Sequence, residues 1–260
     1  MDHLQRIREE FTRQAAGFSA SAVTTEQSQV ARLVDAIGDA ARRQVLDVAC
    51  GPGIVTSALA ERAQEVVALD LTPQMLEKAK ERCSKAGLTN VVFTEGSATA
   101  LPFCDAHFDA VITRLSFHHF PEPSAVLKEM LRVLRPGGTV AIADVVSAEE
   151  PDKSVLQNAI EILRDPSHVR MLPASELIAM VAQSGVTIER QETWDKPREF
   201  EEWVGIVANP ERVAPLRSVV RALAMAGEDA GMGLRLSDGF VHFVHRWQLV
   251  VAKKTSLPMV

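Results

Sequence analysis

Hydrophobic and polar positions follow two different periods along this chain, and stretches of the two kinds alternate. From residue 44 onward, short apolar runs predict strands over 44–50, 65–70, 91–95, 108–113 and 139–145. Between them, apolar residues recurring every three or four positions predict helices over 54–62, 73–86 and 123–134. Strands that alternate with helices favour parallel pairing with right-handed crossovers.

The last third of the chain has a looser pattern. We expect a helix that ends at Arg164, a helix over 174–184, a strand over 186–194, helical stretches over 197–207 and 210–226, and a strand over 241–253. The last two strands would pair antiparallel and complete the sheet. The predicted fold class is α/β, with a Rossmann-like seven-stranded, mostly parallel sheet, helices on both faces, and an inserted and C-terminal helical lid.

A glycine turn follows the first predicted strand. Residues 45–53 read VLDVACGPG, and a second apolar run ends at Asp70. Glycine lets the backbone approach a ligand that a side chain would block, and a carboxylate closing the second strand can accept both hydroxyls of a ribose. A dinucleotide fingerprint would need a third glycine where this chain has Thr56. The pattern therefore predicts a nucleoside pocket of another kind at the carboxyl edge of the sheet.

Composition narrows the class of protein. The 260 residues suit one large domain, and 47% of them are hydrophobic, which is enough for a substantial core. The formal net charge is −6, and no run of Lys or Arg is longer than two, which disfavours a nucleic-acid partner. The three cysteines lack metal-ligand spacing. We expect no metal, no secretory signal, no membrane span and a cytoplasmic location.

The order D-x-x-x-G-x-G from Asp47 to Gly53 resembles motif I of class I S-adenosylmethionine (SAM) methyltransferases. Further segments resemble the small-molecule branch, and in particular the ubiquinone/menaquinone C-methyltransferase-like family. These segments are 11–18, 69–76, 101–103, 108–109, 116–120 and 131–138. The resemblance implies SAM as cofactor and three parts within one globular unit. The parts are an N-terminal helical cap over the cofactor at 1–40, a SAM-binding core at 41–146, and lid helices with the last strands at 147–260.

The resemblance also implies which residues bind SAM. Asp47 would hold the methionine ammonium, Asp70 would hold the ribose, and Phe11 and Phe18 would close over the pocket. The other residues expected to contact the cofactor are Ala49, Gly51, Gly53, Leu71, Met75, Gly96, Ser97, Ala98, Arg114 and Ser116. Leu71 and Met75 would pack on the adenine, and Arg114 and Ser116 would bind the methionine carboxylate.

Structural alternatives stand beside several of these roles. Asp70 could instead cap the next helix, Leu71 and Met75 could be ordinary core residues, and the helix with Phe11 and Phe18 could pack permanently on the core. The family commonly reads Gly-Asp-Ala where this chain reads Gly96-Ser97-Ala98. Ser97 would then accept the adenine amino group through a shorter side chain, or it would be a simple turn serine.

Two adjacent histidines follow the fourth predicted strand, at the edge where such folds bind ligands. Histidine can remove a proton near neutral pH, so we expect His119 to act as base or to orient the acceptor, with His118 in reserve. Both could instead satisfy backbone groups. His168, Trp194 and Trp203 are candidate acceptor contacts, although each could equally anchor the core or the lid.

These residues predict an enzyme that transfers the SAM methyl group in line to a carbon, oxygen or nitrogen of a small, planar or partly apolar metabolite. Amino-group methyltransferases of nucleic acids would carry D/N-P-P-aromatic after the fourth strand, where this chain reads TRLS at 113–116. The alternatives are a SAM-binding regulatory or scaffold protein, or a SAM-assisted enzyme without methyl transfer. We expect a small-molecule partner and a monomer or homodimer.

Overall fold

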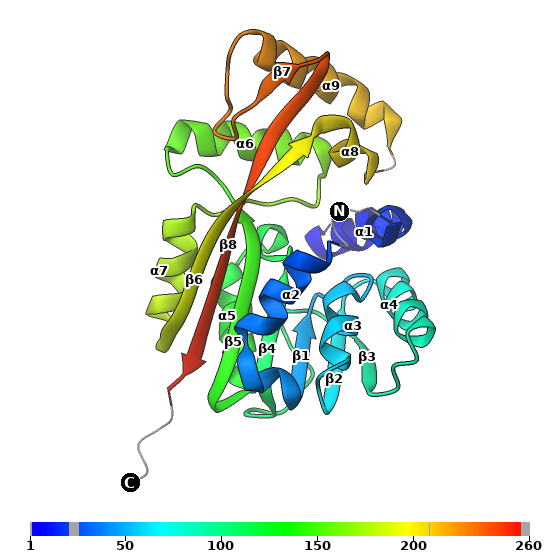
Figure 1. The fold of residues 1–260 in the computed structure, drawn as a ribbon, viewed down its shortest axis with the longest axis vertical. Helices are drawn as coiled ribbons and strands as arrows, with labels where there is room; N and C mark the ends of the chain where they lie inside the picture. Colours follow the sequence, from blue (N-terminus) through cyan, green and yellow to red (C-terminus); the bar gives the residue numbers. More distant parts are fainter. Residues whose placement is uncertain (1, 21–25, 208, 256–260) are drawn as a thin grey trace.

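A computed structural model describes residues 2–20, 26–207 and 209–255 of the chain. In the described residues, eight strands form one sheet. Seven of them lie in the order β3-β2-β1-β4-β5-β8-β6, and the short strand β7 also pairs with β8 (Figure 1). The strands are β1 Gln44–Val48, β2 Glu65–Asp70, β3 Val91–Glu95, β4 Phe108–Arg114, β5 Leu134–Val146, β6 Val186–Glu199, β7 Arg235–Ser237 and β8 Phe240–Lys254. The helices are α1 His3–Ala20, α2 Gln27–Ala36, α3 Ile54–Ala60, α4 Pro73–Lys85, α5 Pro123–Val133, α6 Pro151–Arg164, α7 Ala174–Gln183, α8 Phe200–Gly205 and α9 Pro210–Met225, and two 3₁₀ turns span Gly38–Arg42 and Phe117–His119.

The predicted α/β fold class is confirmed. Strands β1 to β5 pair in parallel, and β8 inserts antiparallel between β5 and β6. The short strand β7 was not predicted, so the sheet has one strand more than the seven expected. Residues 134–138 were predicted as a helix end and turn, but they lie in β5, where Leu134 pairs with Phe108 before the register shifts.

The predicted helix over 197–207 is wrong at its beginning. Residues 197–199 continue β6 because they pair with 242–244 of β8. Helix α8 starts only at Phe200, where the Glu199 carboxylate accepts hydrogen bonds from the backbone N–H groups of Glu201 and Glu202 at 2.8 and 3.2 Å. This cap satisfies two of the N–H groups that a helix start leaves unpaired. Pro197 is compatible with the strand because β6 lies at the sheet edge.

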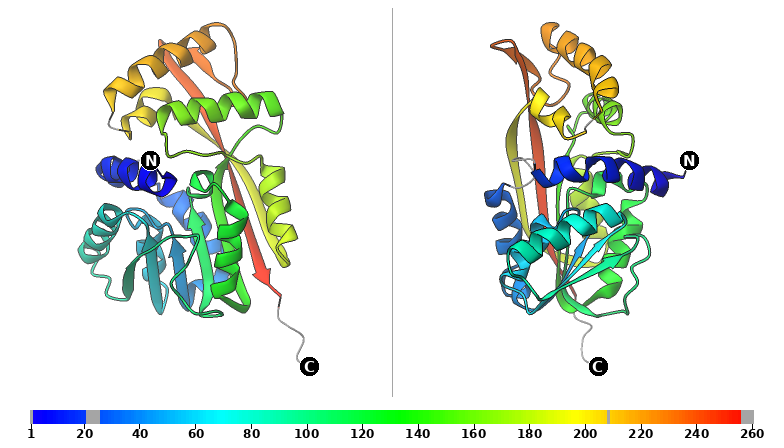
Figure 2. Two further views of the ribbon diagram at one scale, coloured as in Figure 1. Left: turned by 180° about the vertical axis from the view of Figure 1, so that it is seen from behind. Right: turned by 90° about the vertical axis from the view of Figure 1, so that its right-hand side faces the viewer.

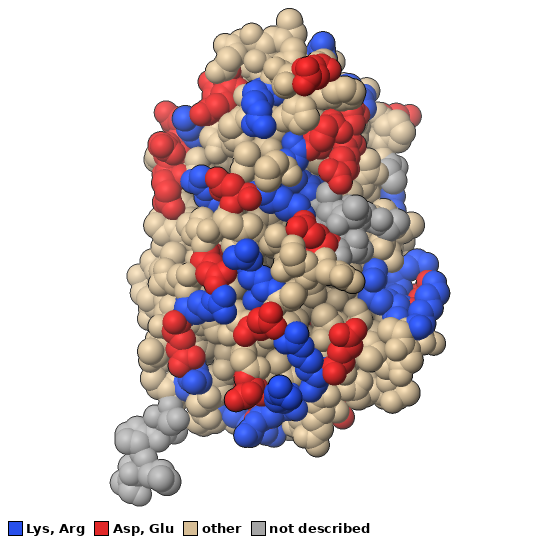
Figure 3. All heavy atoms as spheres, viewed as in Figure 1, with Lys and Arg blue, Asp and Glu red and all other residues tan. Residues whose placement is uncertain are grey.

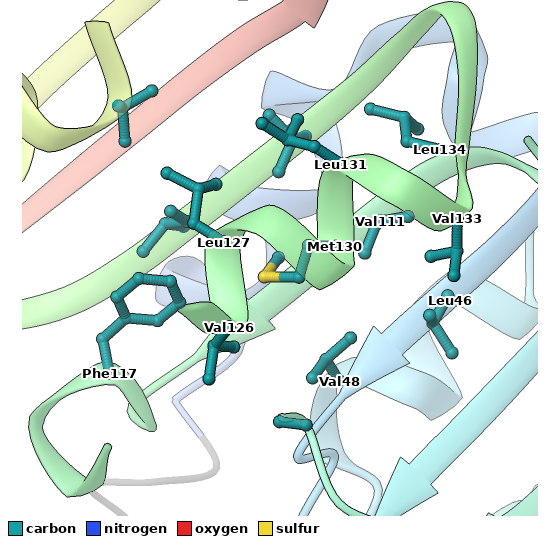
Figure 4. Packing of buried hydrophobic residues seen from close by; sticks show 14 of the residues in the cluster. Leu46, Val48, Val111, Phe117, Val126, Leu127, Met130, Leu131, Val133 and Leu134 are labelled. Atoms are coloured by element: carbon teal, nitrogen blue, oxygen red, sulfur yellow. The ribbon is translucent and has the colours of Figure 1, made fainter. Parts of the chain in front are cut away.

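Helices cover both faces of the parallel part of the sheet. On one face, α5 contributes Met130 and Val133 to a buried cluster with Leu46 of β1 and Val111 of β4 (Figure 4). Helix α7 joins this cluster, while α2 and α3 pack against the opposite face. Val30, Leu33 and Val34 of α2 recur at helical spacing and are all buried on the side that packs against the sheet.

Strands β6 and β8 extend past the parallel part of the sheet and carry a second layer of helices above it (Figures 1 and 2). Helices α6, α8 and α9 pack there around a separate cluster that includes Trp203 and Phe243. We call this part, residues 147–172 and 200–240, the lid. It stands over the carboxyl ends of β1, β2 and β4, where the sequence predicts the ligand.

Helix α1 lies between the lid and the sheet (Figure 2). Buried Glu10 accepts two hydrogen bonds from the Arg212 guanidinium of α9, each at 3.0 Å. Gln14 donates to Asp165, at the end of α6, at 2.9 Å. On the other side, Arg82 of α4 donates to the Ser19 carbonyl at 3.2 Å. Helix α1 therefore connects two parts of the molecule that are far apart in sequence.

The face shown in Figure 3 carries Lys and Arg side chains interspersed with Asp and Glu. As far as its described residues show, it lacks the continuous basic surface that a polynucleotide backbone would need. Among the helices of the described ranges, none is both long and apolar enough to cross a lipid bilayer.

Candidate functional site

A cavity lies at the carboxyl ends of β1, β2 and β4, beneath α1, and together with its opening to solvent it spans about 1040 Å³. We call it the first cavity. It is lined by every residue that the sequence predicted to contact the cofactor, with the exception of Gly53. These residues are Phe11, Phe18, Asp47, Ala49, Gly51, Asp70, Leu71, Met75, Gly96, Ser97, Ala98, Arg114 and Ser116.

Glycine is needed at the two positions of the turn, Gly51 and Gly53, for different reasons. Gly51 has φ +54°, and a Cβ built on it would meet nothing within 4 Å, so this backbone is open toward the cavity. Gly53 has φ +74°, and its Cβ would stand 2.7 Å from the Cβ of Ala79. Gly53 therefore permits close packing of the loop on α4, and it does not line the cavity.

Two buried carboxylates face the first cavity. Asp47 accepts a hydrogen bond from the Thr56 hydroxyl at 2.6 Å, yet burial, with the nearby charge of Asp70, raises the pKa of Asp47 to about 7. Asp70 accepts from the backbone N–H groups of Gly51 and Thr72, both at 2.8 Å, and burial raises its pKa as well. A carboxylate offers about four acceptor positions, so Asp70 retains capacity for a ligand.

Ser97 lies in a short turn at the cavity wall. Its hydroxyl is 2.8 Å from the Thr99 hydroxyl and accepts from the Thr99 backbone N–H at 3.3 Å. The side chain that replaces the usual aspartate is thus engaged within its own loop. To accept a hydrogen bond from an adenine amino group, the Ser97 hydroxyl oxygen would have to do so in addition to its contacts with Thr99.

Apolar residues of α1 form the roof of the first cavity. Phe11 and Phe18 lie with ring centroids 5.8 Å apart, and Phe11 meets the His119 ring edge-on at 4.9 Å. Leu4 and Ile7 also line the cavity and were not predicted. Their spacing with Phe11 and Phe18 places all four on one helical face, a signal that the sequence contained.

His119 is held in a defined tautomer. Its Nδ1 lies 3.0 Å from the Ser167 carbonyl, which can only accept, so Nδ1 carries the proton and Nε2 of the neutral ring keeps its lone pair. Burial, with the neighbouring charge of His118, lowers the pKa of His119 to about 4. The ring is therefore neutral at physiological pH. The described residues give Nε2 no hydrogen-bond partner, and His119 lines the first cavity.

His118 is bound on its other side to a carboxylate. Its Nδ1 donates to Asp144 at 2.6 Å, and its backbone N–H donates to the second oxygen of Asp144 at 3.2 Å. Burial acts to lower the pKa of His118, but the charge and hydrogen bond of Asp144 outweigh it, so the pKa is raised. Of the two histidines, His119 is therefore the one held as a free neutral base.

A second cavity, which spans about 590 Å³ together with its opening to solvent, lies under the lid and shares Phe18, Leu115 and His119 with the first. His119 therefore stands at the junction of the two cavities. The remaining wall comes from the strand ends, α6, α8 and the face of the β6–β8 ribbon that turns toward the lid. It includes His118, Glu161, Arg164, Arg198, Trp203, His245 and Trp247.

The structure separates the three candidate acceptor contacts. Trp203 lines the second cavity. His168 is buried beside it, where its Nε2 donates to the Asn158 side chain at 2.8 Å, and its ring lies 5.4 Å from that of His118. Trp194 stacks on Trp247 at 5.6 Å. Neither His168 nor Trp194 is among the residues that line the two cavities.

Sequence reasoning missed Glu161, Arg164, Arg198 and His245, and it considered Trp247 only as a tryptophan that could stack on a planar substrate. His245 and Trp247 are two residues apart on a strand and so share a face, which is a readable signal. His242 is three residues from His245 on β8 and therefore on the opposite face, and it lies outside both cavities. Arg198 carried no signal, because its segment was expected to be helical.

Comparison with known proteins agrees with this geometry. A family model described as "Methyltransferase domain" matches residues 46–142. The uncharacterized protein YafE of Escherichia coli is 35% identical over 188 residues, which cover 72% of this chain and 90% of YafE. The uncharacterized methyltransferase YcgJ of Bacillus subtilis is 30% identical over 194 residues, covering 75% of this chain and 77% of YcgJ.

A demethylmenaquinone methyltransferase of Renibacterium salmoninarum is 41% identical over 112 residues, which are 43% of this chain and 45% of that protein. Among solved structures, a candidate methyltransferase of Bacillus halodurans superposes with a TM-score of 0.81 and 30% identity, covering 88% of this chain and all of that one. A geranyl diphosphate methyltransferase in complex with SAM has a TM-score of 0.60 at 17% identity, over 88% of this chain and 86% of that one. This last likeness concerns the fold alone.

Proposed function

The chain belongs to the class I SAM-dependent methyltransferases, and from this premise we propose that its acceptor is a small organic molecule held in the second cavity, with His119 as the base. The observation that carries the proposal is the position of His119 at the junction of the two cavities. A group at this junction can face a cofactor on one side and an acceptor on the other.

The residues of the first cavity fit SAM. Asp47 and Asp70 are buried carboxylates with raised pKa values, so a bound cation offsets a cost that the free protein carries. Asp47 would hold the methionine ammonium, Asp70 the ribose hydroxyls, and Leu71 with Met75 the adenine face. When bound, SAM supplies a methyl group on a positively charged sulfur, which makes the methyl carbon electrophilic.

The protein's own contribution is alignment, exclusion of water and proton removal. Helix α1 and the lid cover the junction, so Phe11 and Phe18 would exclude water from the reacting atoms. Alignment of two reactants can contribute about 7–11 kcal/mol at best. The Nε2 lone pair of His119 would accept the proton of the acceptor, and the Ser167 carbonyl would stabilise the resulting imidazolium through Nδ1–H.

The position and lining of the second cavity support a small acceptor. The cavity lies between the lid and the strand ends and adjoins the first cavity at His119. Aromatic side chains of Trp203 and Trp247 in its wall favour a planar or partly apolar molecule. The relative named as a demethylmenaquinone methyltransferase acts on an acceptor of that general kind, which adds support.

The test uses the full-length protein with methyl-deuterated SAM and a panel of small phenols, quinols, enols and amines, read by mass spectrometry. We expect one panel class to gain a deuterated methyl group. His119→Gln should retain SAM affinity and lose about 10²–10⁴ in rate on a proton-bearing acceptor. His242→Gln is the matched control, because it lies outside both cavities and should keep full activity.

Two results would contradict the proposal. SAM binding without transfer to any panel class would argue against a small-molecule acceptor of these chemistries. An undiminished rate in His119→Gln would remove His119 from the role of base, whatever the acceptor.

A further inference from the structure

The second cavity contains a buried guanidinium, that of Arg198, which forms no direct ion pair within the described part of the chain. Most of its charged groups are matched: Glu161 accepts from Arg164 at 3.1 Å and lies 3.2 Å from Nε2 of His245, and Asp144 holds His118. Burial acts to raise the pKa of Glu161, but the Arg164 charge and the His245 hydrogen bond outweigh it and hold that pKa far below its usual range. These pairs are neutral overall.

Arg198 is different. It is only 5% exposed and lines the second cavity, yet its Nε and Nη1 have no hydrogen-bond partner among the described residues. A guanidinium always carries its charge and offers five donors, so burial without a partner is costly. The β6–β8 register sets Arg198 opposite Phe243, on the face that also carries His245 and Trp247.

Trp247, which also lines the second cavity, carries another unsatisfied donor. The indole N–H of Trp247 is buried and has no acceptor within the described part of the chain. Buried donors of native proteins are usually paired, and exceptions call for a ligand, a water or a functional reason. Two residues of this wall therefore carry unsatisfied donors, one of them on a cation, and an anionic oxygen is the kind of group that would satisfy them.

We propose that Arg198, assisted by the Trp247 N–H, binds an anionic oxygen of the methyl acceptor, so that the substrate class is planar molecules carrying a carboxylate or an acidic enol or phenol. The inference rests on the proposed function, because it assigns the second cavity to the acceptor. The anionic group anchors the molecule at the β6–β8 wall, Trp203 contacts its planar part, and the nucleophilic atom is left toward His119. A guanidinium suits this role since it recognises a carboxylate through two parallel hydrogen bonds.

The test measures binding of three probes to the full-length protein saturated with S-adenosylhomocysteine, by calorimetry. The probes are 2-naphthoate, its neutral counterpart 2-naphthamide, and the hydroxy acid 3-hydroxy-2-naphthoate. We expect the naphthoate to bind at least about tenfold more tightly than the amide. Arg198→Met should abolish this preference, and Arg198→Lys should keep part of it. Tighter binding of the hydroxy acid than of the naphthoate would indicate that a phenolic oxygen contributes.

Arg246→Met is the matched control, because Arg246 is exposed and already paired with Asp195 at 2.8 Å. It should keep the preference for the carboxylate. Equal affinity of wild-type protein for the acid and the amide, or an equal loss in Arg246→Met and Arg198→Met, would overturn the inference.

Thermal unfolding supplies a readout that needs no acceptor. If Arg198 is kept for a ligand, the Arg198→Met protein should unfold at the same or a higher temperature than wild type. A clear drop would assign Arg198 a structural role and overturn the inference. If S-adenosylhomocysteine fails to bind wild type, the proposed function itself fails; if it binds and methyl transfer occurs without the anion preference, only this inference fails.

Discussion

Replacing three glycines by alanine, one at a time, separates backbone strain from packing and from cofactor contact. Gly51, Gly53 and Gly87 all have a left-handed backbone, with φ of +54°, +74° and +71°. Gly87 follows α4, far from the glycine turn in sequence, and a Cβ on it would meet nothing within 4 Å. It therefore reports the conformational cost alone.

The magnitudes follow from what each added methyl would meet. An L-residue in the left-handed region costs about 1–2 kcal/mol, which is the expected destabilisation for Gly87→Ala and Gly51→Ala. In Gly53→Ala the new Cβ would stand 2.7 Å from the Cβ and 2.8 Å from the Cα of Ala79, so overpacking adds about 1–3 kcal/mol. We expect Gly53→Ala to lose about 2–5 kcal/mol of unfolding free energy in total.

The assay is urea unfolding at 25 °C followed by tryptophan fluorescence, together with SAM titration of each folded variant. Gly51→Ala should bind SAM about tenfold more weakly, because its backbone faces the first cavity, while Gly53→Ala and Gly87→Ala should bind close to wild type. If Gly53→Ala is no less stable than Gly87→Ala, close packing on Ala79 is not the reason for Gly53. Unchanged SAM affinity in Gly51→Ala would exclude its backbone from the cofactor site.

The remaining predictions concern Asp47, His119 and Gly17. Burial raises the pKa of Asp47 to about 7, and SAM should bind the ionised form of this carboxyl. The affinity for SAM should therefore rise with pH up to about 7, and calorimetry should detect proton release on binding. Asp47→Asn should abolish this pH dependence. Because the pKa of Asp47 is higher in the folded than in the unfolded protein, the free energy of unfolding should fall as the pH rises from the unfolded-state pKa of this carboxyl to about 7. The pKa of His119, lowered to about 4, should place the acid limb of kcat below pH 5, and a limb near 6.5 would contradict its burial. Gly17→Ala should favour helix α1 by propensity, but its new Cβ would stand 2.7 Å from the Ile206 carbonyl oxygen. We expect faster proteolysis of α1 and weaker SAM binding. A more stable protein would argue against this contact.

The parallel half of the fold could be predicted because its information is local. The runs that became β1, β2 and β4 are apolar on both faces, as strands buried between two helical layers must be. The glycine turn and Asp70 follow strands directly, so their common edge follows from parallel pairing. The positions of Asp47, Gly51 and Asp70 around one cavity needed only that argument.

The lining of the second cavity could not be predicted in the same way. Residues 197–199 have no strand signal of their own and extend β6 only because β8 offers them partners at 242–244. Register then decides that Arg198 faces inward with His245 and Trp247, while the lid brings Glu161 from another helix to the same wall.

The sequence by itself therefore determined the α/β fold, the cofactor edge and the histidine pair after β4. Only the tertiary structure decided that His119 joins two cavities, that Gly53 serves packing, and that the buried Arg198 lines the second cavity. The physical reason is that periodicity encodes whether a side chain is buried. Which distant groups surround it depends on how elements far apart in the chain are packed together.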